Sequence, residues 1–269
     1  SETVVHDYPQ VRLVQASTNL GFGKACNVGA KLATNEFLLL LNPDAALQAN
    51  SLLGALEAAQ RPANSKTGLF GVQLKDASGH VAKSCARFPS ALDMVLKATG
   101  IASLIPAMDY HLVTWDHKKS GQVDHVIGAF YLVRRNLYEE LGGFDERFFV
   151  YLEDLDFSYR ARQHGWHTQY LADVQAFHAG GGTSDQVKAL RLYYALRSRI
   201  QYSFKHHGRF GAFCVLAATV VAEPLARLAV AIARRSWINA WETLQAYTRL
   251  TIWLAQHFSR KNPSGQSQP

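Results

Sequence analysis

Apolar positions between residue 11 and about residue 185 follow two alternating patterns, short uninterrupted apolar runs and longer stretches with helical spacing. Short runs bounded by turn residues are typical of buried strands, and the clearest is Phe37–Leu41, which we interpret as a buried parallel strand. The same patterns predict strands at 11–14, 68–74, 128–133 and 169–177, a hairpin arm at 79–87, and helices at 24–33, 51–60, 136–141 and 153–164. This alternation predicts an α/β fold class.

Residues 186–269 carry a different pattern, which predicts a helical extension. Four apolar residues spaced by four form a stripe on one helix face, namely Leu192, Leu196, Ile200 and Phe204. The nearly uncharged run 210–222 is shorter than the ~20 residues needed to span a bilayer, and Glu223 and Pro224 are expected to interrupt it. We therefore predict two parts, a core at 1–185 and an extension at 186–269, joined at the glycine triplet 180–182.

The net charge of +7 is unevenly placed along the chain. Residues 186–269 carry 12 Lys and Arg residues against 2 acidic residues, whereas residues 1–185 carry 16 against 19. A basic, tryptophan-bearing amphipathic segment is typical of helices at a membrane interface, so an anionic membrane surface is a predicted partner. A soluble helical cap or a dimer face is the alternative. The chain shows no zinc, helix-turn-helix or RNP signature, which argues against a nucleic-acid partner.

Composition gives the class of protein and its compartment. With 48% apolar and 18% charged residues, the chain has the composition of a globular protein. Its three cysteines are scattered and odd in number, and they match neither a metal-site spacing nor a disulfide framework, which favours a reducing compartment. The predicted location is therefore cytoplasmic, peripheral on the inner face of the cell membrane.

The densest group of acidic residues lies between Gly142 and Asp156, where it is interleaved with aromatic residues. Buried carboxylates are costly without partners, so this density suggests a site that handles a metal, a sugar or a proton. Glu153 and Asp154 are adjacent at a predicted helix start. There the helix dipole favours ionised acids, while mutual repulsion raises the pKa of one member of such a pair. Acidic residues at a helix N-terminus with no chemical role are the alternative.

Two further segments precede this acidic group. Asp44 follows the strand at 37–41, at the edge of an α/β sheet where ligands bind, and it suits a divalent metal on a diphosphate. A capping Asp in a strand-end turn is the alternative. Gly21 and Gly23 allow a close approach of the backbone to a ligand, and the helix predicted at 24–33 could face phosphate with its N-terminal amides. A tight strand-to-helix turn explains these glycines about as well.

Together, in this order, the segments resemble glycosyltransferase family 2, the inverting enzymes of the Rossmann-like GT-A fold, and most of all its bacterial rhamnosyltransferase-like group. The resemblance covers roughly residues 10–205. The residues that carry it are Asn19 to Gly23, Asn27, Gly29, Leu39 to Asp44, Gly128 to Phe130, Arg134, Arg135, Gly142 to Asp156, Arg160, Gly165 and His178.

The resemblance implies roles for individual positions. It implies that Asp154 is the catalytic base, with Glu153 beside it. It also implies that Asp44 and His178 bind Mg²⁺ or Mn²⁺. The nucleotide-diphospho-sugar donor is expected to contact Asn19, Gly21, Gly23, Lys24, Asn27 and Asn42. The acceptor pocket is expected to include Gly128, Ala129, Phe130, Phe144 and Asp145.

One feature departs from the family pattern. Family members open with a strand, a helix and a second strand that ends in an aspartate that binds the nucleotide base. Here a polar lead-in from Ser1 reaches residue 11 instead. We therefore expect a core that is truncated at its N-terminus, with no assignable base-binding aspartate.

The predicted function is metal-dependent, inverting transfer of a sugar, with rhamnose as one candidate. The sugar would pass from a nucleotide-diphosphate donor to a glycan or lipid-linked acceptor in cell-surface polysaccharide synthesis. Two alternatives stay open. One is an inactive, membrane-associated remnant or binding protein. The other is a sugar-phosphate nucleotidyltransferase, whose glycine-rich and basic N-terminal loop is not visible here.

Overall fold

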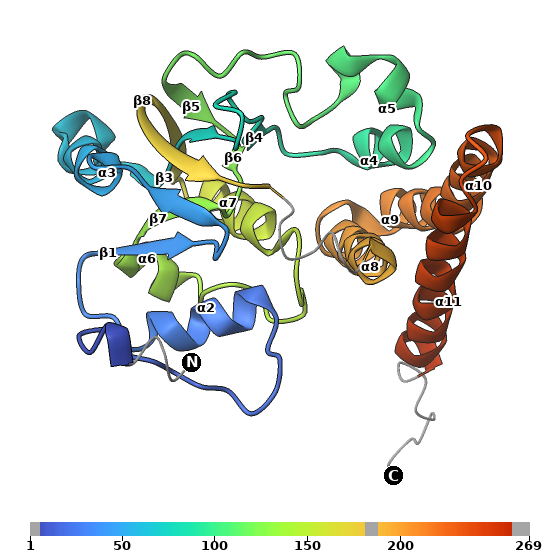
Figure 1. The fold of residues 1–269 in the computed structure, drawn as a ribbon, viewed down its shortest axis with the longest axis horizontal. Helices are drawn as coiled ribbons and strands as arrows, with labels where there is room; N and C mark the ends of the chain where they lie inside the picture. The colour runs from blue at the N-terminus through green and yellow to red at the C-terminus, as the bar shows by residue number, and fades with distance from the viewer. Residues whose placement is uncertain (1–5, 181–187, 260–269) are drawn as a thin grey trace, which may run out of the picture.

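The computed structural model of the chain describes residues 6–180 and 188–259. Figure 1 shows a mixed α/β core on one side and a group of helices on the other. The α/β class and the helical C-terminal part predicted from the sequence are confirmed. The predicted boundary between residues 185 and 186, and two glycines of the triplet, lie outside the described residues.

The central sheet has the strand order β1-β7-β3-β8-β2, with β5 paired to β8. Its strands are β1 Phe37–Leu41, β2 Ala45–Leu47, β3 Thr67–Lys75, β5 Gly121–Val123, β7 Phe130–Arg134 and β8 His167–His178. Within the described residues only β3 and β8 pair in parallel, and the other pairs of this sheet are antiparallel. A second, two-stranded sheet pairs β4 Cys85–Ala86 with β6 His125–Val126.

The helices divide between the two parts of the molecule. Those of the core are α2 Phe22–Ala30, α3 Ser51–Gln60, α6 Arg135–Glu140 and α7 Glu153–Gln163. Those of the helical part are α4 Ala91–Ala98, α5 Ile101–Leu104, α8 Lys188–His206, α9 Gly208–Ala217, α10 Glu223–Ala233 and α11 Trp237–Ser259. The helices predicted at 51–60, 136–141 and 153–164 are confirmed to within a residue, whereas α2 begins two residues before the predicted start.

Alternate residues of the central strands enter two apolar layers. The layer toward α2, α6 and α7 contains Leu69, Tyr131, Val133, Tyr138, Phe144 and Phe157. The layer toward α3 contains Ala55, Ala59, Phe70, Val72, Phe130 and Leu132. Both faces of the sheet are therefore covered, and the side chains from Phe130 to Val133 on β7 form an uninterrupted apolar run.

The strand β1 is not the buried parallel strand that its apolar run predicts. It pairs antiparallel with β7 alone among the described strands, and only Leu38 of its five residues is buried. Leu40 packs in the layer toward α2, while Phe37 and Leu39 pack in the layer toward α3. The run is uninterrupted because helices cover both faces, not because strands flank β1 on both sides.

The strand predicted at 11–14 is wrong. This segment has no regular structure, and Val11, Leu13 and Val14 are 46%, 42% and 47% exposed. A strand needs a neighbour to accept and donate its backbone hydrogen bonds, and none of the described segments pairs with these residues.

Glu223 and Pro224 follow the nearly uncharged run 210–222, but they do not end the helix that contains it. A π-helical turn at Ala218–Ala222 connects α9 to α10, so one helix runs from Gly208 to Ala233. Pro224 lies in the first turn of α10, and the wider turn before it accommodates its missing N–H group. By length and composition this 26-residue helix could cross a membrane, although it carries buried polar contacts described below.

A buried carboxylate ties the core to the helical part. Asp156 on α7 is fully buried, and its Oδ2 accepts a hydrogen bond of 2.8 Å from Arg160 Nε. Its Oδ1 lies 2.6 Å from Lys205 Nζ and 2.7 Å from His206 Nε2, both at the end of α8. Lys205 Nζ also lies 2.7 Å from Asp145 Oδ2. Asp156 thus has one cationic partner within its own helix, Arg160, and two further partners on α8.

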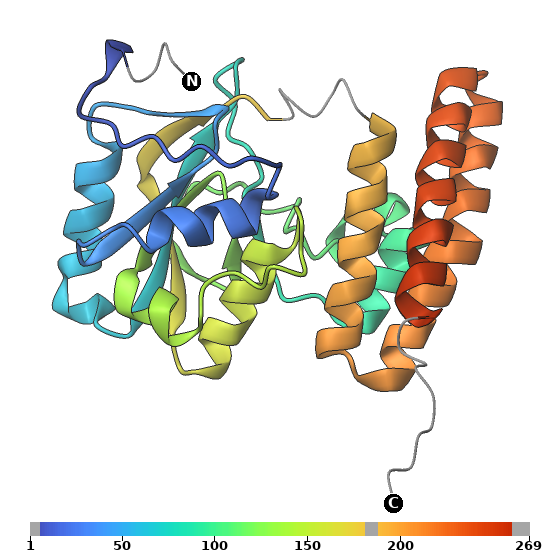
Figure 2. The same cartoon turned by 90° about the horizontal axis from the view of Figure 1, so that it is seen from below.

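These partners set the ionisation of Asp156. Burial raises the pKa of its carboxyl, but the bond from His206 and the charges of Arg160 and Lys205 outweigh burial and hold the pKa below the ordinary 3.8. The carboxylate is therefore charged under all physiological conditions. Figure 2 shows the consequence for the fold: α8, in light orange, lies between the core and the paired α10 and α11.

We expect Asp156→Asn to lower the free energy of unfolding by about 3–5 kcal/mol at pH 7, because the surrounding cations would stay buried without their partner. Urea denaturation followed by circular dichroism measures this change. Glu57→Gln, at an exposed site on α3, is the control and should change the value by less than about 0.5 kcal/mol.

The effect should depend on pH in one direction. A carboxyl whose pKa is lowered by folding contributes stability above its ordinary value of 3.8, and this contribution is lost as the pH falls through the lowered value. The difference in free energy of unfolding between the parent protein and Asp156→Asn should therefore shrink as the pH falls from 3.8 through the lowered pKa. A loss smaller than about 1 kcal/mol at pH 7 would contradict the structural role of Asp156.

Candidate active site

A cavity of about 610 Å³ lies where β1 ends, β7 begins, β8 ends and α7 begins. Seven residues proposed from the sequence line it: Asn42, Asp44, Gly128, Ala129, Glu153, Asp154 and His178. The structure thus brings the predicted metal ligands and the predicted base to one cavity, although they come from distant parts of the chain.

Strand pairing places Asp44 beside His178. Ala45 on β2 is the register partner of His178 on β8, and the N–H of Ala179 donates to the carbonyl oxygen of Asp44 over 3.0 Å. Asp44 Oδ1 consequently lies 3.3 Å from His178 Nε2, and both side chains are partly exposed to the cavity. Asn42 holds this turn through its backbone, because its N–H donates to the carbonyl of Ala129.

A carboxylate and an imidazole at this separation fit two ligands of one divalent cation. Within the described residues, no group of three or more His, Cys, Asp or Glu side chains gathers at one point. The chain would therefore supply two ligands, and diphosphate oxygens or water would complete the coordination, which is usual for Mg²⁺ and Mn²⁺ on nucleotides.

Backbone amides hold the carboxylate of Asp154 in place. The N–H of Gly128 donates to its Oδ2 over 2.7 Å, and the N–H of Leu155 donates to its Oδ1 over 2.8 Å. A Cβ on residue 128 would lie 3.2 Å from that Oδ2, so glycine gives the carboxylate room to approach the backbone. The side chain of Asp154 is 17% exposed and lines the cavity, so it can meet a substrate hydroxyl.

Glu153 is in a different environment from its neighbour. It is 4% exposed, and its Oε2 has no hydrogen-bond partner in the described residues. Burial, and then the charge of Asp154, raise the pKa of Glu153 well above its ordinary value. Its surroundings therefore favour the protonated form of Glu153 over the charged form that a base requires. Of the two adjacent acids, Asp154 is the one placed to accept a proton.

The backbone is strained where it enters α7. Tyr151 and Leu152 have φ angles of +70° and +65°, a left-handed conformation that residues other than glycine rarely adopt. Such strain costs of order 1–3 kcal/mol per residue and is concentrated at functional sites. Here the two residues line the cavity and direct the first turn of α7, with Glu153 and Asp154, into it.

The glycine-rich segment packs against this same stretch of chain. Gly21 has a φ of +75°, and a Cβ there would lie 2.2 Å from the carbonyl oxygen of Phe149. The N–H of Phe22 donates to that oxygen over 2.8 Å, so one amide at the start of α2 is already used. A Cβ on Gly23 would lie 3.2 Å from Phe144 and 3.5 Å from Glu153. The close approach that these glycines allow is to the protein itself.

The other predicted donor contacts of this segment also lie outside the cavity lining. Lys24 is 3.6 Å from Glu146 at the surface. The buried side chain of Asn27 bonds the backbone N–H and carbonyl of Phe144, at 2.9 Å each, and accepts a 2.7 Å bond from Tyr138. Asn19 caps Gly21 through a 3.0 Å hydrogen bond. Of this segment only Phe22 lines the cavity, and donor binding by the others stays a prediction.

The residues of the predicted acceptor pocket lie in different places. Gly128 and Ala129 line the cavity, but Phe130 and Phe144 are 1% and 2% exposed and belong to the two apolar layers of the core. Asp145 pairs with Arg147 and Lys205, outside the cavity lining. Acceptor binding by these residues stays a prediction.

Sequence analysis missed several cavity residues, namely Phe22, Tyr110, His111, His125, Tyr151 and Arg191. His125 is the most buried, with its Nε2 3.7 Å from Asp154 Oδ2 and its Nδ1 2.9 Å from Ser158 Oγ. Burial lowers its pKa, although the charge of Asp154 acts in the opposite direction. No sequence pattern indicates that a histidine in a short strand such as β6 lies beside Asp154. Arg191 comes from α8, far along the chain, so the sequence does not indicate its place at the cavity either.

Comparison with known proteins gives the family. From residue 2 to residue 239 the chain matches the sequence model of the family described as Glycosyltransferase like family 2. It is 29% identical over 194 residues to the N-acetylglucosaminyl-diphospho-decaprenol L-rhamnosyltransferase of Mycobacterium tuberculosis, a match that covers 66% of this chain and 61% of that protein. Rhamnosyltransferase WbbL of Escherichia coli is 29% identical over 170 residues, 59% of this chain and 60% of WbbL.

The chain thus spans about three-fifths of the length of these curated relatives. Among solved structures, mannosyltransferase PcManGT from Pyrobaculum calidifontis, in complex with GDP-Man and Mn²⁺, aligns with a TM-score of 0.48 and 17% identity. That alignment covers 93% of this chain and 72% of the other. Since the family match extends over most of its length, the chain belongs to glycosyltransferase-like family 2.

Proposed function

We propose that the protein is an inverting glycosyltransferase in which Asp154 is the base for the acceptor hydroxyl. The observation that carries the proposal is the cavity itself, where a carboxylate fixed by two backbone amides lines the same space as the Asp44 and His178 pair. Family membership supports transfer of a sugar over the nucleotidyltransferase alternative.

The reaction would be a single displacement at the anomeric carbon of the donor. The acceptor oxygen forms a bond to that carbon while its proton passes to Asp154, and the bond from the carbon to the diphosphate oxygen breaks. The diphosphate leaves toward Asp44 and His178, where a bound divalent cation would neutralise its charge. The backbone amides of Gly128 and Leu155 keep the carboxylate of Asp154 oriented throughout.

The substrates are proposed from the named relatives. Two of them are rhamnosyltransferases, and one acts on N-acetylglucosaminyl-diphospho-decaprenol. We propose a nucleotide-diphospho-rhamnose donor and a lipid-linked glycan acceptor for this chain, in the synthesis of a cell-surface polysaccharide.

An acceptor of this kind is membrane-bound, and the helical part offers a surface for a membrane. Large apolar side chains that are exposed on α9, α10, α11 and the turn between them are Phe210, Phe213, Val221, Leu225, Val230, Ile232, Trp237, Ile238, Trp241, Leu244 and Ile252. Exposed apolar surface on this scale marks an interaction site. Basic residues lie at its ends, Arg209 at the start of α9 and Arg234 and Arg235 after α10, which suits anionic lipid.

We propose that this surface lies on the cytoplasmic face of the membrane and does not cross it. Glu223, in the middle of the long helix, is buried and pairs with Arg199 of α8 and with Arg227. The hydroxyl of Tyr247 on α11 donates to the carbonyl of Thr219 over 3.0 Å. A spanning arrangement would take these charged groups into hydrocarbon, at considerable cost.

Two substitutions distinguish the role of the base from the role of the metal ligands. Asp154→Asn should lower kcat by about 10²–10⁴-fold, the usual contribution of a general base, while donor affinity with Mn²⁺ stays close to that of the parent. Asp44→Ala should weaken Mn²⁺-dependent donor binding by about 10–100-fold, because a ligand is lost. Calorimetry of donor binding, with Mn²⁺ and with EDTA, and initial rates of transfer measure the two effects.

The contrast between the variants is the decisive feature. If Asp154→Asn keeps activity within a few-fold of the parent, Asp154 is not the base. If donor affinity is the same with Mn²⁺ and with EDTA, and Asp44→Ala leaves it unchanged, the metal site is rejected.

Membrane binding can be tested on the full chain with anionic vesicles. We expect binding that weakens as salt rises, and that falls about tenfold in the double variant Trp237→Glu with Trp241→Glu, whose side chains are 76% and 62% exposed. Leu52→Glu with Leu53→Glu, at residues 38% and 58% exposed on α3, is the matched control with the same change of charge and should bind normally. Absence of binding at low salt contradicts the membrane placement, and resistance to alkaline carbonate contradicts a peripheral one.

A further inference from the structure

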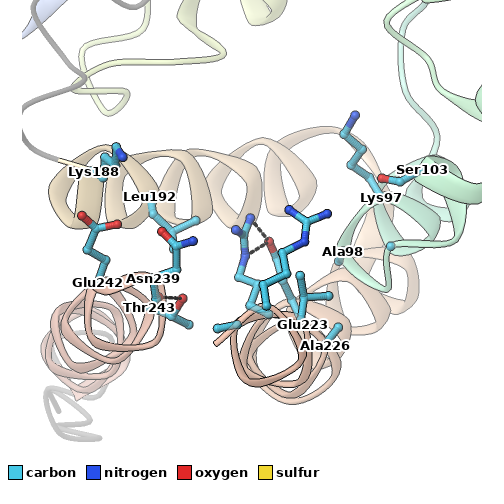
Figure 3. Close-up of a pocket in the computed structure, with 15 residues that line it drawn as sticks. Lys97, Ala98, Ser103, Lys188, Leu192, Glu223, Ala226, Asn239, Glu242 and Thr243 are labelled. Carbon is cyan, nitrogen blue, oxygen red and sulfur yellow. Dashed lines mark hydrogen bonds and ion pairs between the residues drawn. The ribbon is translucent and has the colours of Figure 1, made fainter. Parts of the chain in front are cut away.

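A second cavity, of about 500 Å³, lies in the helical part among α4, α5, α8, α10 and the start of α11. Figure 3 shows its polar lining: Lys188 and Glu242 at one end, Asn239 and Thr243 beside them, Glu223 in the middle, and Lys97 with Ser103 at the other end. None of these residues belongs to the cavity that holds Asp154, and the proposed reaction uses none of them.

The lining has an excess of positive charge. It contains four cationic side chains, Lys97, Lys188, Arg227 and Arg234, against two carboxylates, Glu223 and Glu242. Both oxygens of Glu223 are already used, since Arg227 donates to its Oε1 over 2.7 Å and Arg199 pairs with its Oε2. Lys97 pairs with Asp109. Of the remaining charged residues of the lining, Lys188 and Arg234 outnumber Glu242, which lies at the same end as Lys188. The cavity therefore keeps an excess of positive charge, which suits an anion such as a phosphate or diphosphate.

Apolar side chains border this charged lining. Val230 lines the cavity and is 50% exposed, and Leu104 on the short helix α5 is 82% exposed. Trp237 and Ile238, beside Asn239, are 76% and 72% exposed and belong to the proposed membrane surface. A charged pocket that opens onto such a surface has the chemistry of a lipid with an anionic head, because the head enters the pocket and the chain stays in the membrane.

Two structural links join this second cavity to the cavity that holds Asp154, which we call the catalytic cavity. The first turn of α8 separates them, with Lys188 and Leu192 in the second cavity and Arg191 in the catalytic one. The carboxylate of Asp109 bridges them, since its Oδ2 pairs with Lys97 and its Oδ1 lies 2.7 Å from Nδ1 of His111, which lines the catalytic cavity. A ligand that occupied both cavities would pass around the first turn of α8.

We propose that the second cavity binds the diphosphate of a polyprenyl-diphosphate-linked acceptor, with Lys188 and Arg234 as its main contacts. The lipid chain leaves over Val230 and Leu104 toward the membrane, and the sugar to be extended reaches the catalytic cavity past Arg191. This assignment rests on the proposed function for the identity of the acceptor, but the binding site itself can be tested without any turnover.

The test measures binding to the full chain with EDTA present, so that a metal in the catalytic cavity cannot hold a diphosphate. The probes are farnesyl diphosphate, inorganic pyrophosphate and farnesol. The double variant Lys188→Glu with Arg234→Glu should bind farnesyl diphosphate at least about tenfold more weakly than the parent, since two charge contacts are reversed. Lys118→Glu with Lys119→Glu is the matched control, because it makes the same change of charge at exposed residues of the core that line neither cavity.

We expect the parent and the control to bind farnesyl diphosphate with similar affinity, and both to prefer it to pyrophosphate and to farnesol by about tenfold or more. An equal loss in the two double variants would show general attraction by a basic surface and would overturn the proposal. So would an unchanged affinity in Lys188→Glu with Arg234→Glu, or no binding to the parent. Pyrophosphate binding as tight as that of farnesyl diphosphate would show a site for free anions instead of lipid.

A kinetic comparison separates this proposal from the proposed function. In transfer assays the variant Lys188→Glu with Arg234→Glu should raise KM for a lipid-linked acceptor about tenfold and leave KM for the donor unchanged. Full activity of Asp154→Asn would contradict the proposed mechanism and leave the lipid-binding site unaffected. Failure of farnesyl diphosphate to bind would contradict the lipid-binding site and leave the assignment of Asp154 unaffected.

Discussion

The fully buried carboxylate of Asp156 is the constraint on which the arrangement of both cavities depends. Arg160 holds it from within α7, and Lys205 and His206 hold it from the end of α8. A charge in this position is stable only with such partners, so separating the two helices would cost a large part of the free energy of folding. Fixing α7 places Asp154 at the catalytic cavity, and fixing α8 places Arg191 at that cavity and Lys188 at the other. The catalytic core and the proposed lipid-binding helices are therefore joined by one electrostatic network.

Three acids within four residues acquire three different properties from their surroundings. Glu153 is buried without a partner for one oxygen, and its pKa is raised. Asp156 is buried among cations, and its pKa is lowered. Asp154 lies between them, partly exposed, with its two oxygens bonded to backbone amides. A base must reach the substrate, and of the three acids Asp154 has the carboxylate that is partly exposed to the cavity, although the sequence alone shows three equivalent carboxylates. The environment of each side chain, more than its identity, assigns the role.

Sequence reasoning succeeded where local patterns decide the outcome. The spacing of apolar residues predicted the helices α3 and α7, and the turn residues after β1 predicted the position of Asp44 at the cavity. It failed where the answer depends on a distant partner. The apolar run of β1 reflects helices on both faces, and the segment 11–14 has no neighbouring strand among the described residues. The continuity of the helix through Pro224, which the sequence does not indicate, depends on a π-helical turn and on Glu223 pairing with Arg199. Contacts between residues 50 or more positions apart, such as Asp156 with His206, leave no periodic signal in the chain.

The most direct test of this account is the anomeric configuration of the product. A single displacement with Asp154 as base attacks the anomeric carbon from the face opposite the diphosphate, so every turnover inverts that centre. The full chain would be supplied with a nucleotide-diphospho-sugar, Mn²⁺ and a lipid-linked acceptor, and the anomeric proton of the first product would be recorded by NMR. The account predicts a configuration opposite to that of the donor. A product that retains the configuration of the donor would contradict it.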